Sequence, residues 1–309
     1  MPLYLGEADV EALLGPADAV EAVEACFARM ARGVVDARPR LRLALDPGLL
    51  NVMAGADREL GVAGLKAYAT VEGRRRPLVM LYDSGSGELV ALVEAERLGR
   101  LRTGAASAVA ARHLARTGAR TLGVIGAGRQ AETQIACIRA ALPGIEEVVV
   151  YARTAERLAE FCRRASASPA GYNREVAEQD VVVTITTSRD PVLRGEWLKP
   201  GALVCAVGAN RIEARELDNA ALERAAFVCC DWKEQAQVEA GDLAEPVERG
   251  VLDWLEVHEL AEVVSGNVVG RAAEGDVIIF KSVGIAATDL AVAKLAVDRA
   301  LERGLGSRV

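Results

Sequence analysis

The sequence predicts an α/β protein that has a doubly wound parallel sheet and a second, smaller domain. With 309 residues the chain is too long for one compact core and long enough for two. From Thr121 onward, apolar runs of strand length alternate with helical segments, a pattern typical of a parallel sheet covered by helices on both faces. Aromatic residues make up only 4% of the chain. The core must therefore be built mainly from Val, Leu, Ile and Ala, as in buried parallel strands.

The first part of the chain predicts helices that flank a different kind of sheet. Residues 8–32 predict two helices that are split at Gly15-Pro16, because Gly suits a helix end and Pro suits the first turn of the next helix. Residues 41–93 contain short apolar runs separated by turn signals, which predict a largely antiparallel or mixed sheet. The Ala-rich residues 94–117 predict a further helix.

The alternating region begins after a predicted domain break near residues 116–119. Its apolar runs predict strands at TLGVIGAG, EEVVVYA, DVVVTITT, ALVCAVGA, AFVCCD and DVIIFKSVG. The helix after the second strand has Thr154 in the N-cap position, where a hydroxyl can accept a backbone N–H. A final helix is predicted at about Thr288–Arg303.

Composition and charge exclude several functions. The net charge of −7 is opposite in sign to that of a non-specific nucleic-acid binder. No apolar stretch reaches the roughly 20 residues that a membrane-spanning helix needs, and MPLYLGEADV does not have the form of a signal peptide. The six cysteines form no C-x-x-C pair, so we interpret them as reduced core residues of a cytoplasmic protein. His113 and His258 stand apart from any cluster of ligands, so no metal site is predicted.

The strongest functional motif is a glycine-rich turn between the first strand of the alternating region and the helix after it. The residues are Gly126, Ala127, Gly128, Arg129, Gln130 and Ala131, which match the G-x-G-x-x-A pattern of Rossmann dinucleotide-binding domains. The first glycine permits the tight turn, the second lets backbone N–H groups approach a pyrophosphate, and the alanine permits close packing of helix on strand. The N-terminus of the helix also favours an anion. An ordinary strand-to-helix turn is the alternative, and the strand and helix on either side favour a dinucleotide.

The end of the next strand indicates which dinucleotide is bound. NAD enzymes usually place Asp or Glu there to accept from the ribose 2′-hydroxyl. This chain has Arg153 and Thr154 instead, with Arg157 one turn later. Arginine can hold a 2′-phosphate through charge-assisted hydrogen bonds. We therefore expect NADP(H) to be preferred, with NAD(H) possible. The alternative is that these arginines form a solvated first helical turn, although cations are unfavourable at that end of a helix.

Three isolated cations are candidates for a substrate site. Arg40 lies in ARPRLRL, Lys66 in the predicted strand GLKAYA, and Arg102 in the Ala-rich helix. Buried cations need partners, and an anionic substrate is one such partner. Arginine offers a carboxylate a bidentate fork. On spacing alone, each of the three is more often a surface or salt-bridge residue.

The chain resembles the ornithine cyclodeaminase/mu-crystallin family over nearly its whole length. The resemblance lies in ARPRLRL, NVM at 51–53, GLKAY, LRTGAASAVA, VIGAGRQA, VVVYARTAERL, TTSRDPVLRGEWLKPGALVCAVGANRIEARELD and FKSVGIAATDLAVAKLA. It implies a Rossmann domain over residues 116–285. It also implies a smaller α+β domain, built from residues 1–115 and 286–309, that binds substrate and forms a homodimer.

The resemblance also implies roles for particular residues. Arg40 and Arg102 are expected to hold the carboxylate of an amino or imino acid, and Lys66 to bind the substrate and relay a proton. Other expected substrate contacts are Met53, Asn210, Arg211 and Ser282. The remaining expected cofactor contacts are Thr103, Thr184, Ile185, Thr186, Val207, Gly208 and Ala209.

Two departures favour the reductase branch of this family. Ornithine cyclodeaminases carry an Asp after the VGA turn that acts on the ornithine amine, and Asn210 stands at that place. Asparagine cannot act as a general base. Those enzymes also favour NAD, whereas Arg153 favours NADP. We therefore expect reduction of a C=N bond α to a carboxylate. This branch resembles mu-crystallin-type ketimine reductases, Δ1-pyrroline-2-carboxylate reductases, iminosuccinate reductases and alanine dehydrogenases. Two alternatives stay open: NAD-dependent cyclisation of ornithine to proline with release of ammonia, and a non-catalytic protein that binds NADPH and a small ligand.

Overall fold

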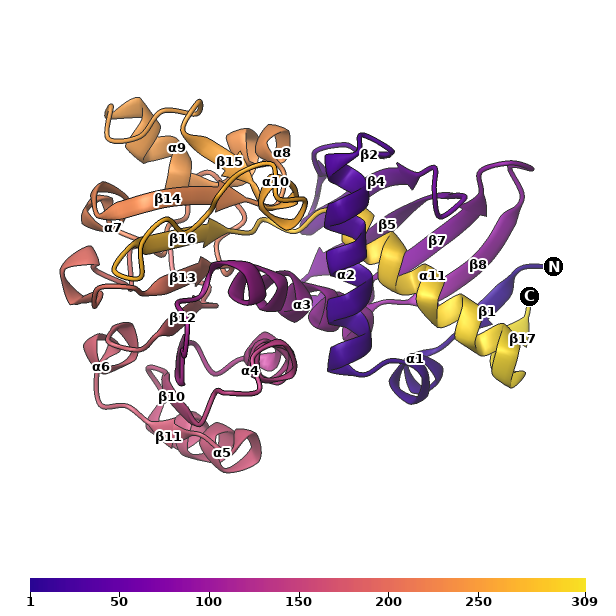
Figure 1. Ribbon diagram of the computed structural model, residues 1–309. Coiled ribbons are helices and arrows are strands. Elements are labelled where there is room, and N and C mark those ends of the chain that lie inside the picture. The colour runs from indigo at the N-terminus through magenta and orange to yellow at the C-terminus, as the bar shows by residue number, and fades with distance from the viewer. The chain divides into compact units, whose positions relative to one another are not determined.

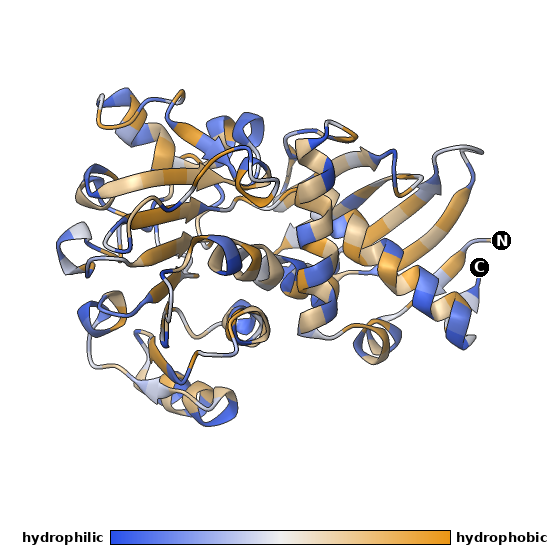
Figure 2. Cartoon of the chain, in the orientation of Figure 1, coloured by the Kyte–Doolittle hydropathy of each residue, from blue (hydrophilic) through white to orange (hydrophobic).

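The computed structural model describes all residues, Met1–Val309, and the chain divides into two compact units (Figure 1). The terminal unit contains Met1–Arg102 and Ile285–Val309, and the central unit contains Thr103–Gly284. Apolar residues run along the strands of both sheets, and the helices alternate apolar with polar residues (Figure 2). No helix is both long enough and apolar enough to cross a membrane.

The terminal unit is a mostly antiparallel sheet whose strands are ordered β17-β1-β8-β7-β5-β4-β2, with β3 paired to β4 and β6 to β5. Its strands are β1 (Leu3–Leu5), β2 (Val35–Ala37), β3 (Leu41–Leu45), β4 (Gly48–Asp57), β5 (Val62–Val71), β6 (Arg74–Arg75), β7 (Leu78–Asp83), β8 (Leu89–Glu94) and β17 (Ser307–Arg308). Its helices are α1 (Glu7–Leu13), α2 (Pro16–Ala31), α11 (Ala286–Arg303) and the first part of α3 (Glu96–Leu114). The predicted pair of helices split at Gly15-Pro16 and the predicted sheet over 41–93 are thus confirmed.

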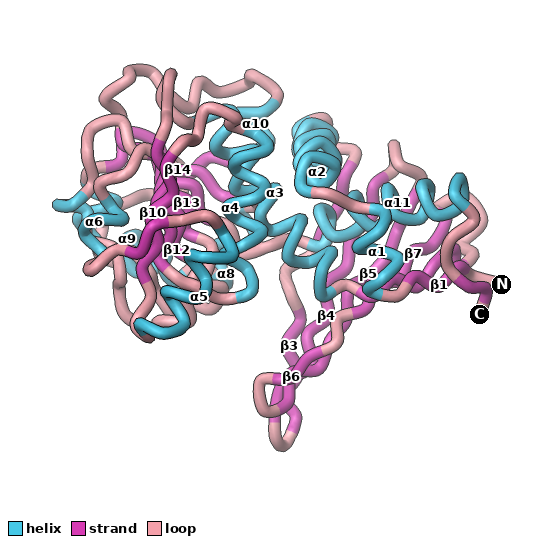
Figure 3. The backbone as a smooth tube through the Cα atoms, turned by 90° about the horizontal axis from the view of Figure 1, so that it is seen from below, coloured by secondary structure: helices cyan, strands magenta, loops and turns pink.

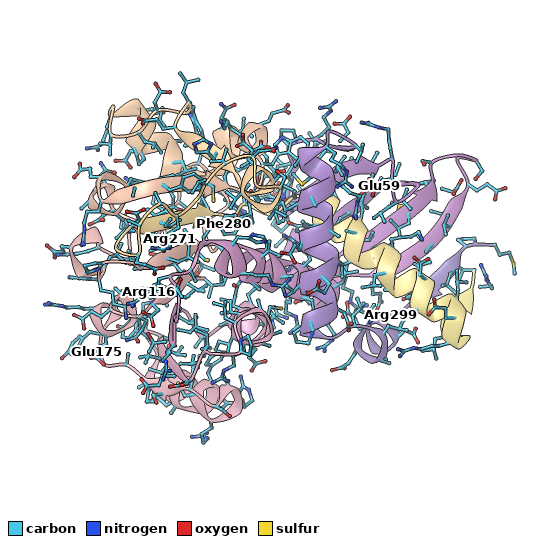
Figure 4. The ribbon with its side chains drawn as sticks, viewed as in Figure 1. Glu59, Arg116, Glu175, Arg271, Phe280 and Arg299 are labelled. Carbon is cyan, nitrogen blue, oxygen red and sulfur yellow. The ribbon has the colours of Figure 1, made fainter.

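Helix α11 brings the end of the chain onto the sheet formed by its beginning. The helix packs on β4, β5 and β7 and beside α2 (Figure 1). Gly64 makes this approach possible, because a side chain there would collide with the backbone of Met80 and with Leu290 of α11. Arg299 of α11 (Figure 4) then donates to Asp18 at 2.6 Å and to the Leu13 carbonyl at 2.8 Å. Helix α11 is therefore packed closely on β5 and is bonded to α1 and α2.

The central unit is a parallel sheet whose strands are ordered β11-β10-β9-β12-β13-β16-β14-β15. The strands are β9 (Thr121–Ile125), β10 (Glu147–Tyr151), β11 (Ser168–Pro169), β12 (Val181–Thr184), β13 (Leu203–Ala206), β14 (Ala225–Cys230), β15 (Val257–Glu259) and β16 (Val277–Lys281). The helices are α4 (Arg129–Ala141), α5 (Ala155–Ala165), α6 (Asn173–Ala177), α7 (Asn219–Glu223), α8 (Lys233–Glu239), α9 (Gly241–Glu248) and α10 (Leu260–Val264), with a 3₁₀ turn at Gly195–Trp197. The neighbouring strands β10 and β12 lie on opposite sides of β9, so the carboxyl ends of β9 and β12 form a topological switch point, the kind of position at which ligands generally bind in open α/β sheets.

The division between the units falls inside a helix that the sequence placed in one domain. The predicted break lay near residues 116–119, with the expected domains meeting between residues 115 and 116, whereas the packing divides the chain between Arg102 and Thr103, within α3. The second half of α3 is bound to the central unit by close contacts. A side chain at Gly104 would collide with the backbone of Thr133, and the Cys205 thiol donates to the Ser107 carbonyl at 3.9 Å. The domain boundaries at residues 115–116 and 285–286 stay a prediction for where each part of the chain folds on its own.

Two local features differ in detail from expectation. Thr154 occupies the N-cap position of α5, but its side chain makes no capping hydrogen bond. Six short strands (β1, β2, β6, β11, β15 and β17) and the helices α6 to α10 were not predicted from the sequence. The six cysteines are all buried as free thiols.

Candidate functional site

The glycine-rich turn has the conformation that a dinucleotide requires. Gly126 has a φ of +121°, and a side chain there would collide with the Ile185 carbonyl. Nothing lies within 4 Å of the position that a Cβ of Gly128 would take, so the backbone is open to a ligand. Helix α4 begins at the next residue, without a side-chain cap to satisfy its first N–H groups. Ala131 is fully buried against the sheet. These features fit a pyrophosphate at the N-terminus of α4.

A pocket of about 440 Å³ lies beside this turn within the central unit. Its lining residues are Ile125, Gly126, Ala127, Gly128, Tyr151, Ala152, Arg153, Thr154, Arg157, Asn173, Ile185, Thr186, Thr187, Ser188 and Val192. The structure therefore brings together eight of the predicted cofactor contacts. The others are not part of this lining: Thr103, Arg129, Gln130, Thr184, Val207, Gly208 and Ala209.

The pocket has cations where an NAD site has a carboxylate. No Asp or Glu is among its lining residues. Arg153 and Arg157 are exposed, and neither forms an ion pair. Both lie at the start of α5, the helix end at which a cation is electrostatically unfavourable unless an anion joins it.

The two loops that follow β12 and β13 are joined by Glu216, a residue that the sequence did not single out. Its buried carboxylate accepts hydrogen bonds from the backbone N–H groups of Thr186, Gly208 and Ala209. It also accepts from the hydroxyls of Thr184 and Thr186. Burial raises the pKa of Glu216, the nearby Lys281 ammonium opposes the rise, and Asp242 adds to it. The predicted contacts of both loops therefore belong to one connected group.

The terminal unit holds a buried cluster of Lys66, Arg102 and Asp289. The Lys66 ammonium on β5 donates to Asp289 Oδ1 at 2.8 Å, and Arg102 Nε on α3 donates to the same oxygen at 3.0 Å. The residues are 5%, 8% and 0% exposed, so all three charges are withdrawn from water. Asp289 Oδ2 is buried without a hydrogen-bond partner. Because Asp289 takes the Nε–H of Arg102, the two terminal nitrogens of the guanidinium remain as a fork for a carboxylate.

Burial and charge set the ionisation of this cluster. Burial lowers the pKa of Lys66 to about 8, with Arg102 and Arg40 adding to the decrease while Asp289 opposes it. Burial alone would raise the pKa of Asp289, but the charges of Arg102 and Lys66 outweigh it and hold that pKa below its ordinary value. Lys66 can therefore exchange a proton near neutral pH, and Asp289 stays ionised.

The other predicted substrate residues are divided between the units. Met53 lies opposite Lys66 in the β4–β5 pairing and is 1% exposed, and Arg40 is 8% exposed in the same unit. In the central unit, Asn210 is half-buried and the Arg211 side chain is 51% exposed. Ser282 is buried, and its hydroxyl donates to Asp231 at 2.8 Å.

Neither Asp289 nor Glu216 was among the predicted residues. The only local signal for Asp289 is a carboxylate on the apolar face of the last helix, in GIAATDLA. Glu216 lies in the segment between β13 and α7, outside any helix or strand, so no local pattern of residues indicates it.

Comparison with known proteins agrees with this architecture. The chain matches the Ornithine cyclodeaminase/mu-crystallin family over residues 2–304. It is 36% identical over 293 residues to a Δ1-pyrroline-2-carboxylate reductase of Bacillus cereus, with 90% of each chain covered. It is also similar to the structure of Thermococcus litoralis Δ1-pyrroline-2-carboxylate reductase in complex with NADH and L-proline, with 30% identity, a TM-score of 0.93 and coverage of 99% and 100%. An archaeal alanine dehydrogenase dimer with bound NAD is 32% identical with a TM-score of 0.93, covering 100% of this chain and 98% of the other. The chain belongs to the ornithine cyclodeaminase/mu-crystallin family.

Proposed function

We propose that the protein reduces a C=N bond α to a carboxylate, using NADPH, to give an L-amino acid. The substrate class is a cyclic ketimine, such as Δ1-pyrroline-2-carboxylate or Δ1-piperideine-2-carboxylate, or a linear imino acid. The observation that carries the proposal is the buried Lys66–Asp289–Arg102 cluster, which offers a carboxylate fork and a proton donor side by side. Reductase and dehydrogenase activities among its relatives support assignment of the chain to the NAD(P)-dependent oxidoreductases.

The proposed chemistry divides the work between the cofactor and the residues of the cluster. A bound nicotinamide dinucleotide supplies the hydride that adds to the imine carbon. Arg102 and Arg40 bind the substrate carboxylate, and their charge withdraws electrons from the adjacent carbon. The protonated Lys66 donates its proton to the imine nitrogen, so that hydride and proton together complete the amine. With a pKa of about 8, Lys66 is mostly protonated at neutral pH and yields its proton readily.

The preference for NADPH rests on the unpaired Arg153 and Arg157 beside the pocket. The 2′-phosphate supplies the anion that these two cations lack, and a carboxylate that would bind the ribose 2′-hydroxyl of NADH is absent from the lining.

We further propose that the protein works as a homodimer. Leu41, Leu43 and Leu45 on β3 are 54%, 47% and 40% exposed, and alternation places them on one face of the strand. Strands β3 and β6 extend beyond the rest of the terminal sheet (Figure 3). Contiguous exposed leucines are typical of a surface that another protein covers, and the related alanine dehydrogenase is described as a dimer.

The test of the proposed reaction is NADPH oxidation, followed at 340 nm, with a panel of imines. The panel contains Δ1-pyrroline-2-carboxylate, Δ1-piperideine-2-carboxylate, iminosuccinate precursors, and pyruvate with ammonia or methylamine. We expect turnover with at least one member and formation of the matching L-amino acid. Proline formation from ornithine without added reductant would instead support a cyclodeaminase. No NADPH oxidation with any member of the panel, by a protein that still binds NADPH, would favour a non-catalytic binding protein.

A further inference from the structure

A second buried ionic cluster, separate from Lys66, lies in the central unit. It consists of Glu216, Asp242 and Lys281, each of which is 0% exposed. Asp242 Oδ1 accepts from the backbone N–H groups of Glu216 at 2.6 Å and Leu217 at 2.9 Å. Asp242 Oδ2 lies 2.8 Å from the Lys281 ammonium. The cluster thus joins the start of α9 and the end of β16 to the loop that carries Glu216.

Two members of the cluster, Glu216 and Lys281, form hydrogen bonds with the loop after β13. The carboxylate of Glu216 accepts from Gly208 N–H at 2.7 Å and Ala209 N–H at 3.2 Å, and Lys281 donates to the Ala209 carbonyl at 2.6 Å. The same carboxylate accepts from Thr186 N–H at 2.7 Å in the loop after β12. A side chain at Gly208 would collide with Glu216 and with the Thr186 backbone. Both loops are therefore held against one carboxylate.

Core stability does not explain this arrangement. Burying three charges carries a desolvation penalty that apolar residues of similar volume avoid, so buried ion groups are weak contributors to stability. What the carboxylate provides, and an apolar side chain cannot, is acceptors for backbone N–H groups from two loops at once. Those loops follow the carboxyl ends of adjacent parallel strands, the edge at which ligands bind in such sheets.

We propose that Glu216, anchored by Asp242 and Lys281, is a positioning residue for the dinucleotide. It acts by fixing the loop Val207–Ala209 to the loop Thr184–Thr186. This inference rests on the proposed dinucleotide site but not on the proposed reaction. The glycine turn has anchors of its own, since Ile185 N–H donates to the Ile125 carbonyl and Gly126 N–H to the Tyr151 carbonyl. The adenosine side of the pocket should therefore keep its shape when the Glu216 cluster is broken, while the loop after β13 does not.

The test is the Glu216→Gln variant, which keeps the size of the side chain but replaces an acceptor oxygen with an N–H₂ donor. We expect the Kd for NADPH, measured by its fluorescence, to rise about tenfold, as the loss of hydrogen bonds to a charged group predicts. The Kd for 2′,5′-ADP, which lacks the nicotinamide half, should change less than about threefold, because the glycine turn is anchored by backbone hydrogen bonds that do not involve Glu216 and Thr186 is the one pocket residue that loses a bond to it. If the protein prefers NADH, then NADH and ADP replace these probes.

The matched control is Asp218→Asn, two residues along the chain. Asp218 also accepts hydrogen bonds from backbone N–H groups, from Gly195 at 2.9 Å and from Ala221 at 3.0 Å. Gly195 lies in the 3₁₀ turn and Ala221 in α7, so neither belongs to the loops that Glu216 joins. Its removal should lower the melting temperature and leave both dissociation constants unchanged. If Glu216→Gln does not fold, Lys281→Met tests the same cluster, since it removes the donor to Ala209, the partner of Asp242 and the cation near Glu216 while leaving the Glu216 carboxylate in place.

Three results would overturn the inference. They are NADPH binding that survives both cluster variants unchanged, equal weakening of NADPH and 2′,5′-ADP, or the same loss in Asp218→Asn. Because binding alone is measured, a protein that fails the imine panel but shows the expected pattern would contradict the proposed reaction and support the positioning role.

Discussion

At the scale of single residues, the environment of Lys66 leads to a prediction about the pH dependence of the proposed reaction. Burial holds the pKa of Lys66 at about 8. If the protonated amine donates to the imine, reduction should proceed at a constant rate well below that pH and decline as the pH rises through it. Oxidation of the amino acid needs the neutral amine and should increase over the same range. The measurement is kcat/KM in both directions between about pH 6 and 10.

Asp289 makes this prediction sharper. Its negative charge opposes the effect of burial on Lys66, so Asp289→Asn should move both limbs of the pH profile to lower pH. In Lys66→Met, the change in kcat/KM around pH 8 should disappear and turnover should fall by about 10²-fold or more, while NADPH binds normally. Asp57→Asn is the control, because Asp57 is also buried, at 2% exposed, and pairs with Arg29 in the same unit. A profile that stays in place in Asp289→Asn would contradict the role of Lys66 as proton donor.

At the scale of elements, the helices, strands and turns that the sequence predicted correctly are those that depend on patterns within short windows of residues. The break at Gly15-Pro16, the strand-turn-helix around Gly126 and the final helix follow from glycine, proline and apolar periodicity over short windows. The ion pairs could not be predicted in this way. Lys66 and Asp289 are separated by 223 positions, and only the packing of α11 on β5 brings them together. The same holds for Glu216, whose hydrogen-bond partners lie at the end of β12 and in the loop after it, in the loop after β13, and at the start of α9.

The junction of β10 and α5 carries the prediction on cofactor choice. Arg153→Asp places a carboxylate where it can accept from a ribose 2′-hydroxyl and repels a 2′-phosphate. The ratio of kcat/KM for NADPH to that for NADH should fall by about tenfold or more, as the loss of a charge-assisted hydrogen bond predicts. Arg163→Asp, at the other end of α5, is the control for the same change of charge. Equal use of NADPH and NADH by the unmodified protein would make the NADP assignment wrong.

At the scale of the whole molecule, the exposed leucines of β3 are the feature that a single chain leaves unexplained. Most large apolar side chains of this protein are buried, yet three lie together on one face of β3. An isolated exposed leucine is ordinary, but an adjacent set on an extended strand favours association and carries a risk of aggregation unless it is covered. In the proposed homodimer, a second copy of the chain buries these leucines.

Leu43→Glu tests this cover, because a charge at the middle of the three leucines must be desolvated if the face is buried. Light scattering after size-exclusion chromatography should give the mass of two chains for the unmodified protein and a concentration-dependent shift toward one chain for the variant. Leu301→Glu is the control, since Leu301 is 52% exposed on α11 and lies outside β3. If the unmodified protein has the mass of one chain at every concentration, no second chain covers the leucines and the proposed homodimer is wrong. A Leu43→Glu variant that stays dimeric while Leu301→Glu dissociates would instead move the interface from β3 to α11.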